Sequence, residues 1–253
     1  MIPSLFLAHG SPMTAIEDNE YTSFLKGLSS KIKPKAIVIF TAHWESDILT
    51  ISSSDETYDT IYDFGGFPQE LYEIKYPAKG SGQLAQILKG KFEQKGIAVR
   101  EDVRRGLDHG SWTLLYQMYP AADIPVVQIS VNPYLEPEKQ FEIGETLKGM
   151  GKENILVIGS GVTVHNLRAI KWGQQEPDQW AVDFDDWLID KIKKEDLKSL
   201  FKYEKQAPNA QIAVPTPEHF MPFFIAMGSG ETQPTILHRS YELGNLSYLS
   251  MQF

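Results

Sequence analysis

The hydrophobic positions of the chain fall into short continuous runs that alternate with amphipathic stretches. Short runs rich in β-branched residues are typical of strands buried on both faces, as in a parallel sheet. We expect such strands at residues 5–8, 36–41, 124–131 and 155–158. Residues 48–52 and the final segment 246–253 have the pattern of further strands, and we place the last at an edge of the sheet.

Between these runs, apolar residues recur at helical spacing. Helices are expected near residues 21–28, 82–94, 111–119, 137–150, 179–192 and 218–227. The alternation predicts an α/β fold with a central, mostly parallel or mixed sheet and helices on both faces. No repeat, low-complexity tract or linker divides the sequence, so we expect one domain over residues 1–253.

The composition excludes several classes of protein. The 253 residues include no cysteine, which rules out disulfides, thiolate metal sites, iron–sulfur clusters and cysteine nucleophiles. The formal net charge of −9 argues against nucleic-acid binding, because phosphate contacts need a basic surface. No apolar run reaches the roughly 18 residues of a membrane span, and no basic segment of a signal peptide begins the chain. We therefore expect a soluble, cytoplasmic protein with no membrane partner.

Three of the six histidines follow predicted strands. His9 ends the first strand in "LFLAHGSPM", His43 follows the second in "IFTAHWES", and His165 comes after "NILVIGSG". In open α/β sheets, ligands collect in the crevice at the carboxyl ends of the strands. A shared site is therefore a better account of these three histidines than three separate structural roles.

The other histidines lie outside strands. His109 is in the predicted turn "GLDHGSW", before a helix for which Ser111 is the candidate N-cap. His219 follows "PTPE" at a predicted helix start, and His238 is assigned a structural or surface role.

Imidazole is a good ligand for Fe(II) and Zn(II), and sites with open positions are typical of non-haem iron oxygenases. Histidines without thiols thus favour a catalytic metal that leaves coordination positions for a substrate. Neither H-E-x-x-H nor a short H-x-H pair occurs, so distant segments would have to assemble the site.

Six ordered motifs carry a family resemblance: "LFLAHGSPM", "TAHWES", "DFGGFP", "GLDHGSW", "VHNLR" and "PTPEHFMPF". Together they closely resemble the DODA-type (DOPA dioxygenase-like) extradiol ring-opening dioxygenases of the class III superfamily. The resemblance implies a single α/β domain with a non-haem metal at one end of its sheet. It also implies cleavage of a catechol ring beside its two hydroxyls, with O2 as the second substrate.

The resemblance also implies roles for the histidines. His9, His43 and His219 match the metal ligands, with Glu218 as the carboxylate alternative to His219. His165 matches an active-site histidine that is either a fourth ligand or an acid/base. His109 matches a histidine that hydrogen-bonds substrate or oxygen. Fe(II) is expected for activity, and Zn(II) is a candidate in the isolated protein.

Aromatic residues near the motifs are candidate pocket walls, although core packing is the usual role of each. They are Trp44, Phe64, Phe67, Trp112 and Phe220.

Two other functions use the same histidines. A zinc hydrolase would activate a metal-bound water, with Glu218 as its general base. A metal-binding protein without catalysis would have a closed coordination shell. Oxygen dependence distinguishes the dioxygenase from the hydrolase, and an open coordination position distinguishes it from the non-catalytic protein. Nothing in the sequence indicates the oligomeric state.

Overall fold

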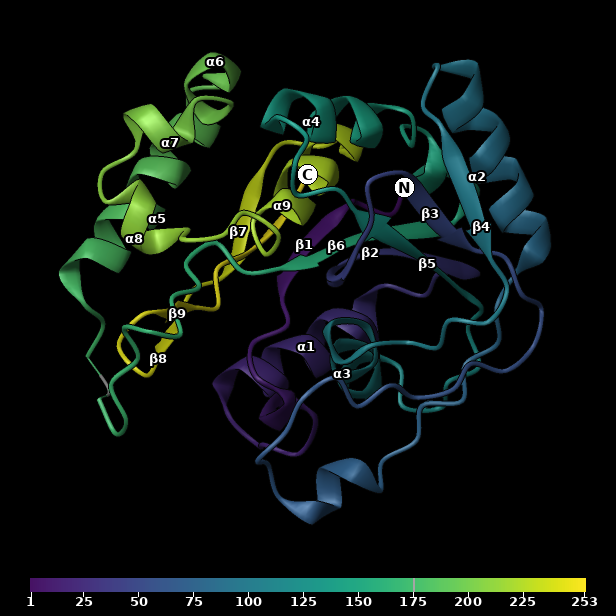
Figure 1. The fold of residues 1–253 in the computed structure, drawn as a ribbon, viewed down its shortest axis with the longest axis horizontal. Coiled ribbons are helices and arrows are strands. Elements are labelled where there is room, and N and C mark those ends of the chain that lie inside the picture. The colour runs from purple at the N-terminus through teal and green to yellow at the C-terminus, as the bar shows by residue number, and fades with distance from the viewer. Residues whose placement is uncertain (175) are drawn as a thin grey trace.

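The computed structural model describes residues 1–174 and 176–253 (Figure 1). Its main sheet has eight strands, in the order β4-β3-β5-β2-β6-β1-β10-β7, and the predicted apolar runs supply most of them. The strands are β1 (Leu5–Ala8), β2 (Ala36–Glu45), β3 (Leu49–Ser52), β4 (Val99–Asp102), β5 (Val126–Val131), β6 (Ile155–Gly161), β7 (Thr235–His238) and β10 (Ser250–Gln252). Two short strands, β8 (Tyr241–Glu242) and β9 (Leu246–Ser247), pair separately.

The middle of the sheet is parallel. Strand β2 pairs in parallel with both β5 and β6, and β6 pairs in parallel with β1. Antiparallel pairs flank this centre, where β3 meets β5 and β10 meets β1. The predicted mostly parallel, mixed sheet is confirmed. As a result, the carboxyl ends of β1, β2 and β6 lie together at one edge.

Helices cover both faces of the sheet, as predicted (Figure 1). The main helices are α1 (Glu20–Lys31), α2 (Gly82–Gln94), α3 (His109–Met118), α4 (Pro137–Glu145), α5 (Gln179–Lys193) and α9 (Met221–Ser229). Short ones are α6 (Leu197–Leu200), α7 (Tyr203–Gln206), α8 (Ala210–Ala213) and the 3-10 turns η1 (Pro12–Ala15), η2 (Gln69–Tyr72) and η3 (Met150–Glu153). No helix among the described residues combines the length and apolar character needed to cross a bilayer.

Two hydrophobic clusters hold these layers together. On one face, α1 and α3 pack against the sheet through buried residues such as Leu25 and Trp112. On the other face, α2, α4, α5 and α9 bury residues such as Leu88, Phe184 and Phe224. The burial of this apolar surface is the main force that stabilises the layered fold.

The sequence misplaced some elements. The final strand β10 lies between β1 and β7, so its predicted edge position is wrong; the edge strand is β7. Helix α3 begins at His109 with Asp108 as its N-cap residue, so Ser111 is inside the helix and is not the cap. Strand β4, with the sequence VRED, has no apolar run to reveal it.

Candidate metal centre

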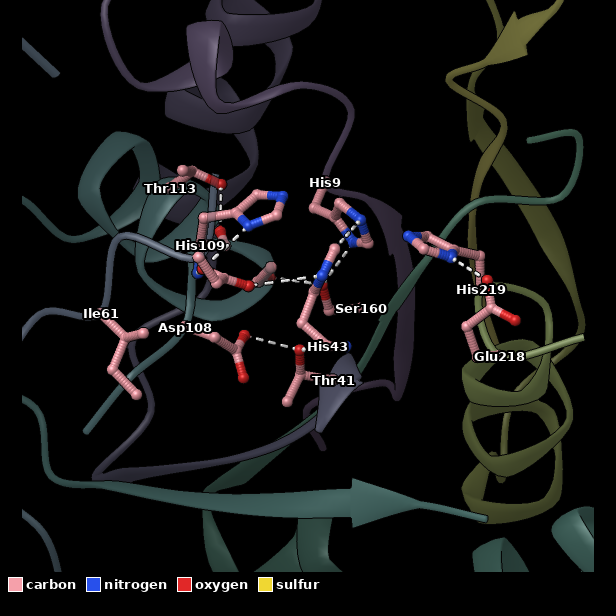
Figure 2. A network of polar contacts seen from close by, with 12 residues as sticks. His9, Thr41, His43, Ile61, Asp108, His109, Thr113, Ser160, Glu218 and His219 are labelled. Atoms are coloured by element: carbon pink, nitrogen blue, oxygen red, sulfur yellow. Dashed lines mark hydrogen bonds and ion pairs between the residues drawn. The ribbon is translucent and has the colours of Figure 1, made fainter. Parts of the chain in front are cut away.

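Three histidines from distant segments meet at the carboxyl edge of the sheet. His9 follows β1, His43 lies near the end of β2, and His219 comes just before α9 (Figure 2). One ring nitrogen from each lies within 4.8 Å of the others, and the Nε2 atoms of His9 and His43 are 3.0 Å apart. We call these three residues the histidine triad.

An oxygen atom occupies the Nδ1 side of each triad ring. Ser160 Oγ is 3.1 Å from Nδ1 of His9, and Glu218 Oε1 is 2.9 Å from Nδ1 of His219. Because the Ser160 hydroxyl donates to the Gly110 carbonyl, its oxygen is left to accept the Nδ1–H of His9. These contacts favour a proton on Nδ1 of His9 and of His219. The Nε2 atoms of the two rings then keep their lone pairs, which face inward.

One of the inward nitrogens lacks a protein partner. Nε2 of His219 is buried and has no hydrogen-bond partner among the described residues. The Nε2 atoms of His9 and His43 lie 3.0 Å apart and can form a hydrogen bond only if one of them carries a proton. Buried polar atoms are normally paired, so an orphaned nitrogen in this position needs an explanation. A cation bound by all three Nε2 atoms would satisfy them, and the residues therefore fit a metal ion.

Burial favours the neutral form of His9 and His43. Loss of solvent, followed by the neighbouring imidazoles, lowers the pKa of His9 well below its ordinary value and that of His43 to about 2. Neutral imidazole is the form that binds a metal.

Two glycines bring His219 into the triad. Gly159 and Gly161 lie in β6, where an added Cβ would collide with the carbonyl oxygens of Pro222 and His219, respectively. The backbone N–H of Val162 also donates to the His219 carbonyl over 2.8 Å. Glycine at these positions lets the segment before α9 pack directly on the strand.

His165 lies beside the triad but does not join it. Its ring stacks on that of His219, with centroids 3.8 Å apart and planes 12° apart. Burial, followed by the neighbouring His219, lowers the pKa of His165 to about 3. Its ring nitrogens group with Glu218 and His219, and not with His9 or His43.

A cavity of about 360 Å³ opens on this side of the triad. This volume falls at the low end of the roughly 300–1,000 Å³ typical of small-molecule sites. Its lining residues are His165, Asn166, Leu167, Arg168, Pro215, Thr216, Glu218 and His219.

His109 lies on the opposite side, at the first position of α3. Its ring centroid is 3.9 Å from that of His43, and Nδ1 is 3.0 Å from Asp63 Oδ1. Thus all five motif histidines gather at one place, whereas His238 stacks on Phe24 and contacts Ser240 elsewhere.

A buried polar network holds the end of β2. Asp108 is fully buried and accepts hydrogen bonds from Thr41 Oγ1 and Arg105 Nη2, at 2.7 and 3.0 Å. Arg105 Nη2 also donates to the His43 carbonyl. The network fixes the backbone that carries His43 and ties it to the start of α3.

The candidate aromatic walls divide between site and core. Phe64 lies edge-on to His109 at 5.6 Å, Phe67 packs on Phe64, and Trp44 lies under the Arg105 guanidinium. Trp112 and Phe220 are fully buried in the two core clusters.

Sequence reasoning missed the residues that hold the histidines. Ser160, Asp63, Asp108 and Arg105 had no assigned role, although Asp63 and Asp108 lie inside the motifs "DFGGFP" and "GLDHGSW". Two signals were available in the sequence: Asp108 directly precedes a motif histidine, and Asp63 lies close to the glycine pair of its motif.

Comparison with known proteins identifies the family. Residues 3–251 match the family described as the catalytic LigB subunit of aromatic ring-opening dioxygenase. The chain belongs to this family. The family resemblance drawn from the six motifs is confirmed, and the protein is an aromatic ring-opening dioxygenase.

Named relatives of this dioxygenase match over nearly its whole length. The "4,5-DOPA dioxygenase extradiol" of Beta vulgaris is 40% identical, covering 99% of this chain and 96% of the relative. The protein of the same name from Escherichia coli (strain K12) is 38% identical, covering 99% and 94%. A crystal structure of an uncharacterized protein from Escherichia coli K12 has a TM-score of 0.85, with 34% identity and full coverage of both chains.

Proposed function

We propose that this dioxygenase opens the ring of a DOPA-like catechol beside its hydroxyls, with O2 as co-substrate and Fe(II) held by His9, His43 and His219. The observation that carries the proposal is the inward convergence of three Nε2 atoms whose Nδ1 sides face oxygen. Three protein ligands leave positions for substrate, as in other non-haem iron oxygenases. The names of the relatives, both 4,5-DOPA dioxygenases, support the substrate class.

When bound, Fe(II) would supply the redox chemistry that lets a catechol and O2 react at one centre. The same triad also suits Zn(II), which has no redox chemistry, and we propose that a zinc-loaded form would not turn over.

His165 is the proposed acid/base. Its imidazole lines the cavity next to the triad, so it is placed to take a proton from a catechol hydroxyl bound there. Its position outside the triad supports this role over that of a fourth ligand.

His109 is the proposed hydrogen-bonding residue on the other side. The Asp63 carboxylate, 3.0 Å from its Nδ1, supports an imidazole held in a fixed orientation. With the proton on that Nδ1, the Nε2 lone pair would accept a hydrogen bond from a hydroxyl group of the substrate.

The hydrolase alternative needs Glu218 as a free base. Glu218 instead accepts hydrogen bonds from Thr216 Oγ1 and from Nδ1 of His219. Burial would raise the pKa of Glu218, but the hydrogen bonds from His219 and Thr216 outweigh burial and lower that pKa to about 2. A carboxylate engaged in this way is a weak proton acceptor.

The test is oxygen uptake by protein reconstituted anaerobically with Fe(II), measured against a panel of catechols that includes DOPA. We expect uptake of one O2 per catechol, a yellow ring-opened product, and no uptake by the Zn(II) form. Catechol turnover without oxygen uptake would contradict the proposal. Failure of the Fe(II) form to turn over any catechol of the panel would also contradict it.

A further inference from the structure

Asp63 is a charged residue of the site that has so far been considered only as a neighbour of His109. It precedes Phe64 in the "DFGGFP" loop, and a quarter of its side chain is exposed. Among the described residues, no lysine or arginine lies within 4.0 Å of its carboxylate. The carboxylate is therefore not committed to a surface ion pair.

Its two oxygens face two different histidines. Oδ1 accepts the backbone N–H of His109 at 2.9 Å and lies 3.0 Å from Nδ1 of the same residue. Oδ2 lies 3.4 Å from Nδ1 of His43. One carboxylate thus contacts a triad ring and a ring outside the triad at once.

Neither approach has full hydrogen-bond geometry, and Nδ1 of His109 is buried without such a bond, but each places a carboxylate oxygen beside one particular nitrogen of the ring. A carboxylate is only an acceptor when ionised, so it favours a proton on the Nδ1 that faces it. His43 then keeps its Nε2 lone pair toward His9 and His219, which is the arrangement a metal requires. The Asp63 carboxylate also lies beside the His109 ring and accepts the backbone N–H of His109, and these two contacts restrict the orientation of the ring.

We propose that Asp63 is a positioning residue shared by His43 and His109. It orients His43 for metal binding and His109 for hydrogen bonding in the reaction, so that one side chain couples the metal centre to the hydrogen-bonding histidine beside it. This inference rests on the proposed function, since it takes His43 as a ligand.

The substitution Asp63→Asn tests the metal half of this inference. The amide oxygen can still accept the His109 N–H, but the amide nitrogen in place of Oδ2 is a donor and favours the other tautomer of His43. We expect Co(II) and Fe(II) affinity, measured by chelator competition, to fall about 10–100-fold.

Asp55→Asn is the matched control. Asp55 also accepts a backbone N–H, from Gly82 at 2.7 Å, yet no histidine ion pair involves it. The control should bind metal as the wild type does. Circular dichroism and thermal unfolding verify that both variants fold.

The two halves of the account fail in different ways. If the wild type binds neither Co(II) nor Fe(II), the proposed function fails. If the wild type binds and folded Asp63→Asn binds equally well, the shared role of Asp63 is wrong while the metal site stands.

The His109 half is tested by a double-mutant cycle on kcat at saturating Fe(II). We expect Asp63→Asn to lower kcat in the wild-type background and to add no further loss to His109→Gln, because Asp63 acts through His109. Full additivity of the two losses would overturn this half.

A further test uses the wild-type protein, so its result does not depend on whether a variant folds. In the Zn(II)-loaded protein, long-range 1H–15N NMR reports which His109 nitrogen is protonated. The inference predicts a proton on Nδ1; a bare Nδ1 would contradict it.

Discussion

At the scale of residues, the site depends on which nitrogen of each histidine carries the proton and which keeps its lone pair. Their positions after predicted strands indicated His9 and His43, and the motif resemblance indicated His219, but neither pointed to the partners of the Nδ1 atoms. His9 and Ser160 are 151 positions apart, and only the β1–β6 pairing brings them together. No local pattern in the sequence reports a contact of that kind.

We expect His165→Gln to keep its metal and to lose turnover. His165 lies outside the triad and beside the cavity, so its loss removes a proton acceptor and leaves the three ligands in place. General acid–base groups contribute about 10²–10⁴-fold to rate, and kcat should fall within that range. Metal analysis and steady-state kinetics with the active catechol provide the measurement.

His238→Gln is the control for that experiment, because His238 packs on Phe24 and contacts Ser240 away from the triad. It should retain both metal and kcat. Loss of metal from His165→Gln would instead make His165 a fourth ligand, and unchanged kcat would remove its acid/base role.

At the scale of elements, the contact between β6 and the segment before α9 positions His219. Glycines 159 and 161 permit that contact, because a side chain at either position would collide with the backbone of the segment. Helix α9 was expected from residue 218 but begins at Met221. The preceding residues include two prolines, and their backbone instead serves to bring His219 against β6.

The substitution Gly161→Ala tests the element-scale account. The new Cβ would meet the His219 carbonyl, so the segment must shift away from the strand. We expect about 1–3 kcal/mol less unfolding free energy, as for other overpacked positions, together with weaker metal binding. Denaturant unfolding and chelator competition measure the two effects.

Gly90→Ala supplies the matched control in α2, where no atom lies within 4 Å of the added Cβ. Alanine there should raise stability by about 0.5–1 kcal/mol, because glycine is unfavourable inside a helix. If Gly161→Ala were as stable as the wild type and bound metal normally, close packing on β6 would not be what positions His219.

At the scale of the whole molecule, the parallel centre of the sheet makes the site. It gathers the ends of β1, β2 and β6 at one edge, and two histidines and Ser160 come with them. The apolar runs were sufficient to predict this layered fold and its site edge. They were not sufficient to place β10 inside the sheet or to reveal β4, because strand order and short polar strands depend on pairing between distant segments.

The loop that carries Asp63 belongs to the same scale. It reaches the site only because it packs beside α3, where Asp63 meets the first residue of the helix. Its sequence contributed one of the motifs of the family resemblance and two candidate aromatic walls, while its charged residue contacts two of the five clustered histidines.

The most direct test of the account is anomalous diffraction at the iron edge from crystals of this protein grown anaerobically with Fe(II). The account predicts a single peak bonded to the Nε2 atoms of His9, His43 and His219, with His165 and Glu218 outside the coordination shell. No peak among these three nitrogens, or a peak held by a different set of residues, would contradict it.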